Sequence, residues 1–124
     1  MSATLLPLHP GTGGREIAVT ADDSVALERL LATLGEVEDP ELPIGIVDLG
    51  LVRRVTVEHG RVTVGLTYTS LACPCVEMLR EDVHDVVAAL SDVRAVTVED
   101  VLEPWSRDDV SPAGIEILRA VAVL

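Results

Sequence analysis

The chain has 124 residues and a formal net charge of −12, and this length predicts one domain that buries about two-thirds of its unfolded surface around a single core. All nine basic residues are arginine, and the chain has one tyrosine, one tryptophan and no phenylalanine, which argues against nucleic-acid binding because that needs clustered positive charge and aromatic platforms. The absence of lysine excludes Schiff-base chemistry and a phosphate-binding loop lysine.

Neither the start of the chain nor its cysteine content suggests export or membrane insertion. Residues 1–7 have no basic segment and too short an apolar run for a secretory signal. Nothing in the chain approaches the roughly 18 apolar residues that a membrane helix needs. Two cysteines separated by one residue make a poor disulfide framework and suit a reducing compartment. We therefore expect a cytoplasmic protein that binds no membrane.

The first third of the chain predicts a leader and one helix. Residues 1–21 contain prolines and glycines without sustained periodicity, which predicts a flexible leader. A helix is predicted from the acidic capping segment Asp22–Ser24 to Gly35, because leucines recur at i, i+3, i+4 and i+7, namely Leu27, Leu30, Leu31 and Leu34. Pro40 and Pro43 prevent its continuation.

The remainder predicts a β-hairpin followed by a helix, a strand and a last helix. Residues 51–58 and 61–69 alternate apolar and polar side chains around the tight-turn pair His59-Gly60. Residues 74–90 show a helical period, residues 95–102 predict a third strand, and Ser111-Pro112 is typical of a helix start. The order helix, strand, strand, helix, strand, helix predicts one α+β domain over residues 22–124. Its two layers are a small mixed three-stranded sheet and helices on one face of that sheet.

Both cysteines of the chain, Cys73 and Cys75, lie where the second strand of the hairpin gives way to the following helix. They could be small packing residues of that corner. Two features favour chemistry instead. Pro74 suits the first helical position, which places Cys73 near the N-cap, where thiolates are favoured. The two sulfurs are also close enough along the chain to approach one metal, although a bridged cluster would need a second protomer, small-molecule thiols or a client protein.

Five further residues are candidate site residues, either near the thiols or at a surface for a partner protein. Asp39 and Glu41 lie in a proline-rich loop, where an aspartate before proline commonly fixes a turn through its side chain. Asp48 lies among apolar residues and needs a partner, so it either bonds backbone N–H groups or acts beside the cysteine as a base or orienting group. Of the two threonines on one side of the second strand, Thr67 and Thr69, the second is closer to the thiols, so its hydroxyl could orient a sulfur or a bound anion. Trp105 either caps the core or lines a surface for a partner protein.

Three ordered motifs resemble those of the small iron–sulfur cluster assembly domain family, which includes SufT, PaaD and the eukaryotic cytosolic iron–sulfur targeting factors. The first motif is Asp39–Pro43 followed by Ile46–Val52. The second is Thr69, which three residues separate from Cys73-Pro74. The third comprises Pro104–Ser106, then Asp109–Ser111 and Gly114. The resemblance runs from about Ser24 to Leu124, which is nearly everything except the leader.

The resemblance implies an α/β domain with a reactive cysteine in a shallow pocket. The cysteine of the family falls on Cys73, its acids on Asp39, Glu41 and Asp48, and its threonine on Thr69. Ala72 stands where the family usually has glycine, and Cys75 lies outside the shared motif. The cysteine-rich extension of PaaD-like members is missing, so the chain looks most like a stand-alone SufT-like protein.

These observations lead to one main hypothesis and two alternatives. The main hypothesis is a non-enzymatic maturation factor that carries or targets iron, sulfur or a transient cluster to apo-client proteins, with Cys73 as its thiolate, Cys75 as an auxiliary ligand and Trp105 at a partner surface. Its expected partners are iron–sulfur assembly proteins, client proteins and a second copy of the chain in a homodimer. The alternatives are a thiol enzyme with Cys73 as nucleophile and Asp48 as base, and an interaction module whose cysteines only pack.

Overall fold

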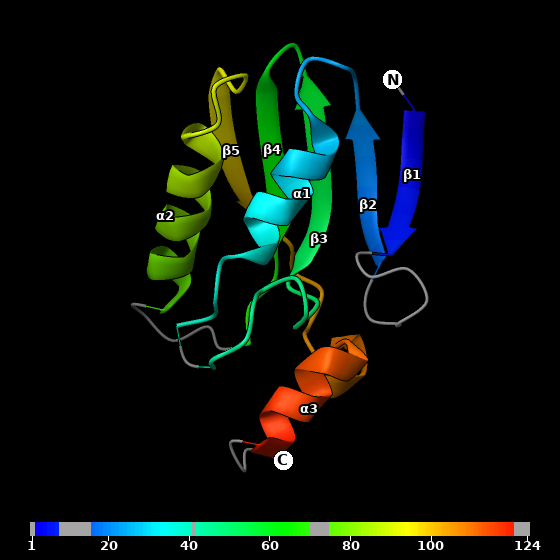
Figure 1. Ribbon diagram of the computed structural model, residues 1–124, viewed down its shortest axis with the longest axis vertical. Helices are drawn as coiled ribbons and strands as arrows, with labels where there is room; N and C mark the ends of the chain where they lie inside the picture. The colour runs from blue at the N-terminus through cyan, green and yellow to red at the C-terminus, as the bar shows by residue number, and fades with distance from the viewer. Residues whose placement is uncertain (1, 8–15, 41, 70–74, 121–124) are drawn as a thin grey trace.

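The computed structural model describes residues 2–7, 16–40, 42–69 and 75–120. These residues form five strands, three α-helices and one short 3₁₀ helix, and Figure 1 labels the strands and the α-helices. In chain order the elements are β1 (Ser2–Pro7), β2 (Glu16–Ala21), α1 (Leu27–Gly35), β3 (Val52–Glu58), β4 (Arg61–Leu66), α2 (Cys75–Ala88), β5 (Ala95–Asp100), the 3₁₀ helix η1 (Arg107–Asp109) and α3 (Pro112–Ala120).

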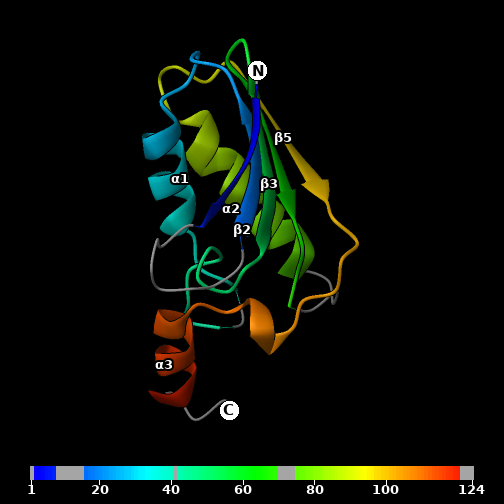
Figure 2. The ribbon, with the colours of Figure 1, turned by 90° about the vertical axis from the view of Figure 1, so that its right-hand side faces the viewer.

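The strands form one mixed sheet whose spatial order follows the chain, β1-β2-β3-β4-β5. The pairs β1–β2 and β3–β4 are antiparallel, whereas β2–β3 and β4–β5 are parallel. Parallel neighbours need a crossover connection, and α1 and α2 supply the two crossovers. Both helices cover the same face of the sheet, while α3 lies beyond its end (Figures 1 and 2). The predicted α+β class, with a helical layer on one face of a mixed sheet, is therefore confirmed.

The predicted strand count of three is wrong, because the sheet has five strands. Both additional strands come from residues 1–21, for which we expected a flexible leader. Strand β2 pairs in parallel with β3, and its Ile17 and Val19 are only 1% and 3% exposed. Two alternating apolar residues are too short a pattern to predict a strand. The pairing partner of β2 lies more than thirty residues further along the chain, so the chain segment itself gives little sign of it.

The core is aliphatic and lies between the sheet and the helices α1 and α2. Leu30 and Leu34 of the predicted leucine stripe are fully buried, and Leu27 and Leu31 pack against the core from its edge. From α2 the buried side chains are Leu79, Val83 and Val87, and from the central hairpin they are Val52, Val55, Val57, Val62, Val64 and Leu66. The inward residues of the hairpin alternate as the sequence predicts, and they match the period-2 geometry of a strand.

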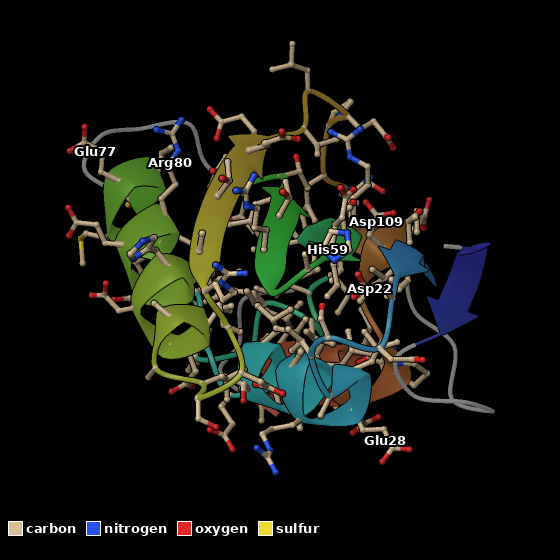
Figure 3. The ribbon with its side chains drawn as sticks, turned by 90° about the horizontal axis from the view of Figure 1, so that it is seen from above. Asp22, Glu28, His59, Glu77, Arg80 and Asp109 are labelled. Carbon is tan, nitrogen blue, oxygen red and sulfur yellow. The ribbon has the colours of Figure 1, made fainter. Side chains whose placement is uncertain are left out.

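The segment Asp22–Ser24 does not cap α1 as predicted. Helix α1 begins at Leu27, and its N-cap, Ala26, has no side-chain cap. Asp22 instead accepts the backbone N–H of His59 at 2.8 Å, and Ser24 accepts that of Gly60 at 2.8 Å, so the segment holds the hairpin turn (Figure 3). Hydrogen bonds from the Ser24 hydroxyl and from the His59 backbone lower the pKa of Asp22 to about 2. The turn itself needs this support, since His59 has a φ of +50°.

Candidate functional site

Cys75 is the first residue of α2, where the backbone N–H groups of the first turn have no partner within the helix. The residue is half-buried. An anion at this end of a helix is stabilised by those N–H groups and by the helix dipole. Cys73 and Glu41, two of the predicted site residues, lie outside the described residues.

A cavity of about 380 Å³ lies beside the start of α2. Residues from the end of β4, from the first turn of α2 and from the segment that follows β5 line it, namely Thr67, Tyr68, Thr69, Val76 and residues 100–105. Thr69 and Val76, which flank the two cysteines in the sequence, are both part of its wall. The described residues on either side of the cysteine segment therefore both line this cavity.

Thr69 and Asp39, both predicted as site residues, are brought together. The Thr69 hydroxyl donates to Oδ1 of Asp39 at 3.3 Å, and the other carboxylate oxygen accepts the backbone N–H of Leu42 at 3.0 Å. Asp39 is 8% exposed. Its carboxylate therefore fixes the turn through Pro40, as predicted for an aspartate before proline, and also connects that loop to the end of the cavity wall.

Asp48 binds Ser111, which directly precedes α3. Its Oδ1 accepts the Ser111 hydroxyl at 2.7 Å, and its backbone carbonyl accepts the Ser111 N–H at 2.7 Å. The Ser111 hydroxyl oxygen also accepts the backbone N–H of Gly114 at 3.1 Å. Ser111 is therefore the N-cap of α3. Asp48 thus ties the first motif of the chain to the start of the last helix.

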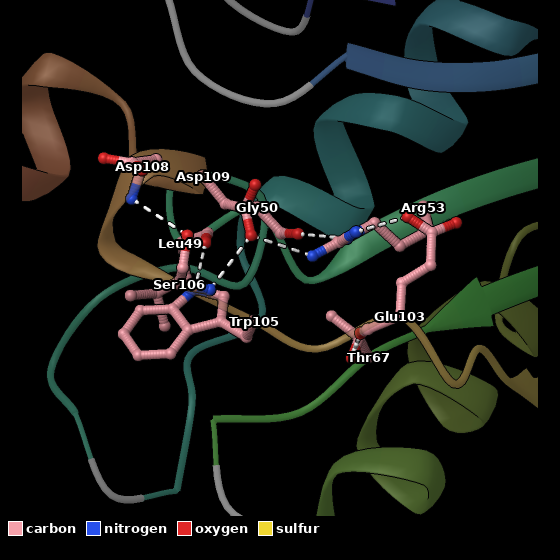
Figure 4. A network of polar contacts seen from close by, with 9 residues as sticks. All are labelled: Leu49, Gly50, Arg53, Thr67, Glu103, Trp105, Ser106, Asp108 and Asp109. Atoms are coloured by element: carbon pink, nitrogen blue, oxygen red, sulfur yellow. Dashed lines mark hydrogen bonds and ion pairs between the residues drawn. The ribbon is translucent and has the colours of Figure 1, made fainter.

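Trp105 packs against the core, which is one of the two roles that we considered for it, and it also lines the cavity. Its indole N–H donates to the carbonyl of Leu49 at 2.6 Å, and its ring packs against the core while lining the cavity (Figure 4). A tryptophan in this position buries most of its apolar ring and satisfies its single donor. The half-buried ring leaves one edge available to whatever enters the cavity.

Arg53, which we had not singled out, is the centre of a buried polar cluster (Figure 4). It is 4% exposed, and its guanidinium donates to Gly50 O at 2.9 Å, to Glu103 Oε2 at 3.0 Å and to Asp109 Oδ2 at 2.9 Å. An irregularity in the β3–β4 register between Val52 and Arg54 accompanies this inward position. An arginine directly after Leu51-Val52 was the available signal, because a charge that continues an apolar run must find a partner if it is buried.

A second polar cluster that the sequence did not reveal borders the cavity at Tyr68. The Tyr68 hydroxyl donates to Asp100 Oδ1 at 2.6 Å, and Arg80, on α2, also donates to Asp100. Burial, together with the bond to Asp100, raises the pKa of Tyr68 to about 12. The bond from Arg80 holds the pKa of Asp100 below its ordinary value. Both shifts widen the pH range over which Tyr68 stays protonated and Asp100 stays ionised.

The part of the chain that the structure describes contains neither a group of metal-ligating side chains nor a membrane-spanning helix. Within the four described ranges, no three histidine, cysteine, aspartate or glutamate side chains are grouped as a metal ion would require. No helix in the same part of the chain is long and apolar enough to cross a membrane.

Comparison with known proteins assigns the chain to a family. Residues 27–99 match the family model described as iron–sulfur cluster assembly protein. The chain belongs to this family. It is 37% identical over 86 residues to the Fe-S protein maturation auxiliary factor YitW of Bacillus subtilis, and this match covers 68% of the chain and 84% of the relative. It is also 37% identical over 86 residues to a Fe-S protein maturation auxiliary factor of Porphyromonas gingivalis, a match that covers 68% of the chain and 82% of that relative.

Two solved structures share the fold of this chain. A domain of unknown function, DUF59, from Bacillus anthracis superposes with a TM-score of 0.68 at 32% identity, over 78% of this chain and 92% of that one. A conserved hypothetical protein of Thermotoga maritima gives a TM-score of 0.67 at 29% identity, over 81% of this chain and 97% of that one. The resemblance found in the three sequence motifs is therefore confirmed at the level of the family and of the fold.

Proposed function

We propose that this iron–sulfur assembly family protein is a maturation factor that uses a thiolate at the start of α2 to carry or target iron, sulfur or a cluster to client proteins. The observation that supports it is the position of Cys75 at the first residue of α2, beside a 380 Å³ cavity, in a chain whose relatives are named Fe-S protein maturation auxiliary factors.

In this proposal Cys73 is the essential thiolate and Cys75 the auxiliary one. Three relatives at 37–40% identity are named maturation auxiliary factors, which supports a stoichiometric role. Two thiolates from one chain supply half of the four ligands that an iron–sulfur cluster usually takes. A homodimer or a client protein would complete the set, and the cargo would then be held transiently. A reducing cytoplasm is the compartment in which such thiols stay free.

The acids and the threonine act on the loops that carry the thiols. Asp39 accepts the Thr69 hydroxyl, so the proline-rich loop and the strand end that leads to the cysteines are held in one arrangement. Glu41 belongs to the same loop by sequence. Asp48 acts at one remove, because its bond to Ser111 fixes the segment that begins α3. We assign to these residues the positioning of the site rather than the binding of iron.

The experiment that tests this function is anaerobic reconstitution with iron and sulfide. Wild type, Cys73→Ser, Cys75→Ser and the double variant are compared by visible absorption and by bound iron and sulfide. We expect uptake of about one cluster per two chains in wild type, loss of uptake in Cys73→Ser, and a weaker, more rapidly lost chromophore in Cys75→Ser. Circular dichroism controls for folding.

Equal iron and sulfide uptake by wild type and Cys73→Ser would contradict the carrier role of this thiol. A thiol enzyme would show catalytic turnover of an acyl or persulfide donor that Cys73→Ser abolishes. An interaction module would be indifferent to the double serine variant in both assays.

A further inference from the structure

Leu102 is an unusual residue on the rim of the cavity. Its side chain is 95% exposed, the highest value among the large hydrophobic residues that the structure describes. The backbone on both sides of it is nevertheless fixed. The Val101 N–H donates to Leu66 O at 2.7 Å, and the Glu103 carbonyl accepts the Thr67 hydroxyl at 2.6 Å. Exposed leucines on mobile loops are common, but here an apolar side chain is held outward on an anchored backbone.

The same segment is anchored again further on, so the wall of the cavity is formed in advance. Arg53 binds the carboxylate of Glu103 at 3.0 Å, and the indole of Trp105 binds Leu49 O at 2.6 Å. A surface that is already ordered loses little conformational entropy when a partner binds. We call the apolar part of this wall, formed by Val76, Val101, Leu102, Pro104 and Trp105, the Leu102 surface.

The polar groups of the cavity limit the chemistry of its occupant. The hydroxyl protons of Thr67, Tyr68 and Thr69 are all donated within the protein. What the wall offers is apolar area and acceptor oxygens. Among the described lining side chains, these acceptors suit an apolar group that is flanked by N–H donors.

The charges of the cavity wall further restrict the chemistry of the occupant. Asp100 and Glu103 line the cavity, and none of the described lining residues is basic. The Glu103 side chain is 58% exposed, whereas that of its partner Arg53 is 3% exposed, so the carboxylate is the member of the pair that faces solvent. With a net charge of −12 on the whole chain, a basic partner segment is attracted to this wall.

We propose that the Leu102 surface is the docking site for an extended segment of a client or assembly protein, which inserts one large apolar side chain into the cavity and places lysine or arginine beside Asp100 and Glu103. The partner class rests on the proposed maturation function. The volume of about 380 Å³ lies at the small end of ligand pockets and suits one or two side chains. Docking here would bring the partner to Thr69 and Val76, next to the thiols in the sequence.

The single tryptophan of the chain lines this cavity, so its fluorescence reports binding directly. The probes are the capped peptides Gly-Lys-Leu-Lys-Gly, Gly-Lys-Ala-Lys-Gly and Gly-Glu-Leu-Glu-Gly, titrated into the full chain. We expect a saturable change of emission with the first peptide. The alanine and glutamate peptides should bind at least about 10-fold more weakly, and added salt should weaken the binding of the first peptide.

Leu102→Ala should weaken binding of the lysine–leucine peptide by about 5-fold or more. Ile117→Ala is the matched control, because it removes another exposed aliphatic side chain, 38% exposed and on α3, and should leave binding unchanged. Neither change touches a fully buried side chain, so both variants should fold, as circular dichroism can verify.

Three results would overturn the proposal. One is no saturable binding by wild type up to about 5 mM, the range in which weak contacts still register. Another is that wild type binds the lysine–leucine and glutamate–leucine peptides with equal affinity, or that Leu102→Ala and Ile117→Ala bind the lysine–leucine peptide equally well. The third is a wild-type dimer in sedimentation equilibrium that Leu102→Ala dissociates, which would assign the surface to a second copy. Iron and sulfide uptake by Leu102→Ala should equal that of wild type, so failure of docking and failure of the thiol role are read in separate assays.

Discussion

Two arginine–carboxylate clusters flank the segment that follows β5, and they differ mainly in burial. In the Arg53 cluster the side chains of Arg53 and Asp109 are 3% and 10% exposed. In the Asp100 cluster the side chains of Arg80 and Asp100 are 42% and 36% exposed. Both clusters hold parts of the cavity wall, and both join residues more than fifteen positions apart in the chain.

The difference in burial separates their roles. Removing one member of a buried ion pair leaves a charge where water cannot solvate it, whereas an exposed pair contributes little free energy. The Arg53 cluster is therefore needed for the fold of residues 103–109. The Asp100 cluster stabilises the fold far less, but it sets the protonation of a tyrosine at the cavity. The three following predictions test this contrast.

The largest effect is expected for Arg53→Met. This change leaves Asp109 buried without its guanidinium, and it should lower the free energy of unfolding by about 3–5 kcal/mol. Arg54→Met is the matched control, since the neighbouring arginine pairs with Glu99 at 3.4 Å with both side chains about half exposed. Arg54→Met should lower the free energy of unfolding by less than about 1 kcal/mol. Urea denaturation followed by Trp105 fluorescence measures both, and equal losses in the two variants would refute the contrast.

A smaller loss is expected for Gly50→Ala, at the residue whose carbonyl binds Arg53. Gly50 has a φ of +79°, and a Cβ added there would lie 2.8 Å from the Cβ of Asp109. Strain and overlap together should lower stability by about 2–3 kcal/mol. Gly35→Ala, at the end of α1 where nothing lies within 4 Å, should be neutral or slightly stabilising. Thermal unfolding of both variants measures the difference, and a stability of Gly35→Ala equal to or below that of Gly50→Ala would contradict the prediction.

The smallest effect on stability, and a spectroscopic one, is expected in the Asp100 cluster. The single tyrosine of the chain should ionise near pH 12 rather than 10, because burial and the bond to Asp100 raise the pKa of Tyr68. A raised pKa stabilises the fold fully below the ordinary value of about 10, and this contribution disappears as the pH rises through about 12.

Ultraviolet titration of tyrosinate measures this midpoint. Asp100→Asn should move the midpoint down toward the ordinary value, because the carboxylate no longer accepts the hydroxyl proton, with little loss of stability at neutral pH. An unchanged midpoint in Asp100→Asn would mean that burial alone sets the pKa.

Much of this protein follows from local sequence patterns. The leucine stripe of α1, the alternating strands around His59-Gly60 and the helix that begins near Cys75 are encoded over short windows, and they are found as predicted. The family was also identifiable from the sequence, because its motifs combine prolines, glycines and acids whose spacing is set by turns. The structure places Asp39 and Thr69 together, whereas Cys73 and Glu41 lie outside the described residues and their roles remain predictions.

The tertiary structure alone decided where distant segments meet. The parallel pairing of β2 with β3, the bond of Asp48 to Ser111 and the burial of Arg53 against Asp109 each join parts of the chain that no local pattern relates. A short segment determines its own period and its own turns, because those depend on neighbouring residues. Whether a charged side chain is solvated or buried against an opposite charge depends on which distant backbone covers it, and that is a property of the complete fold.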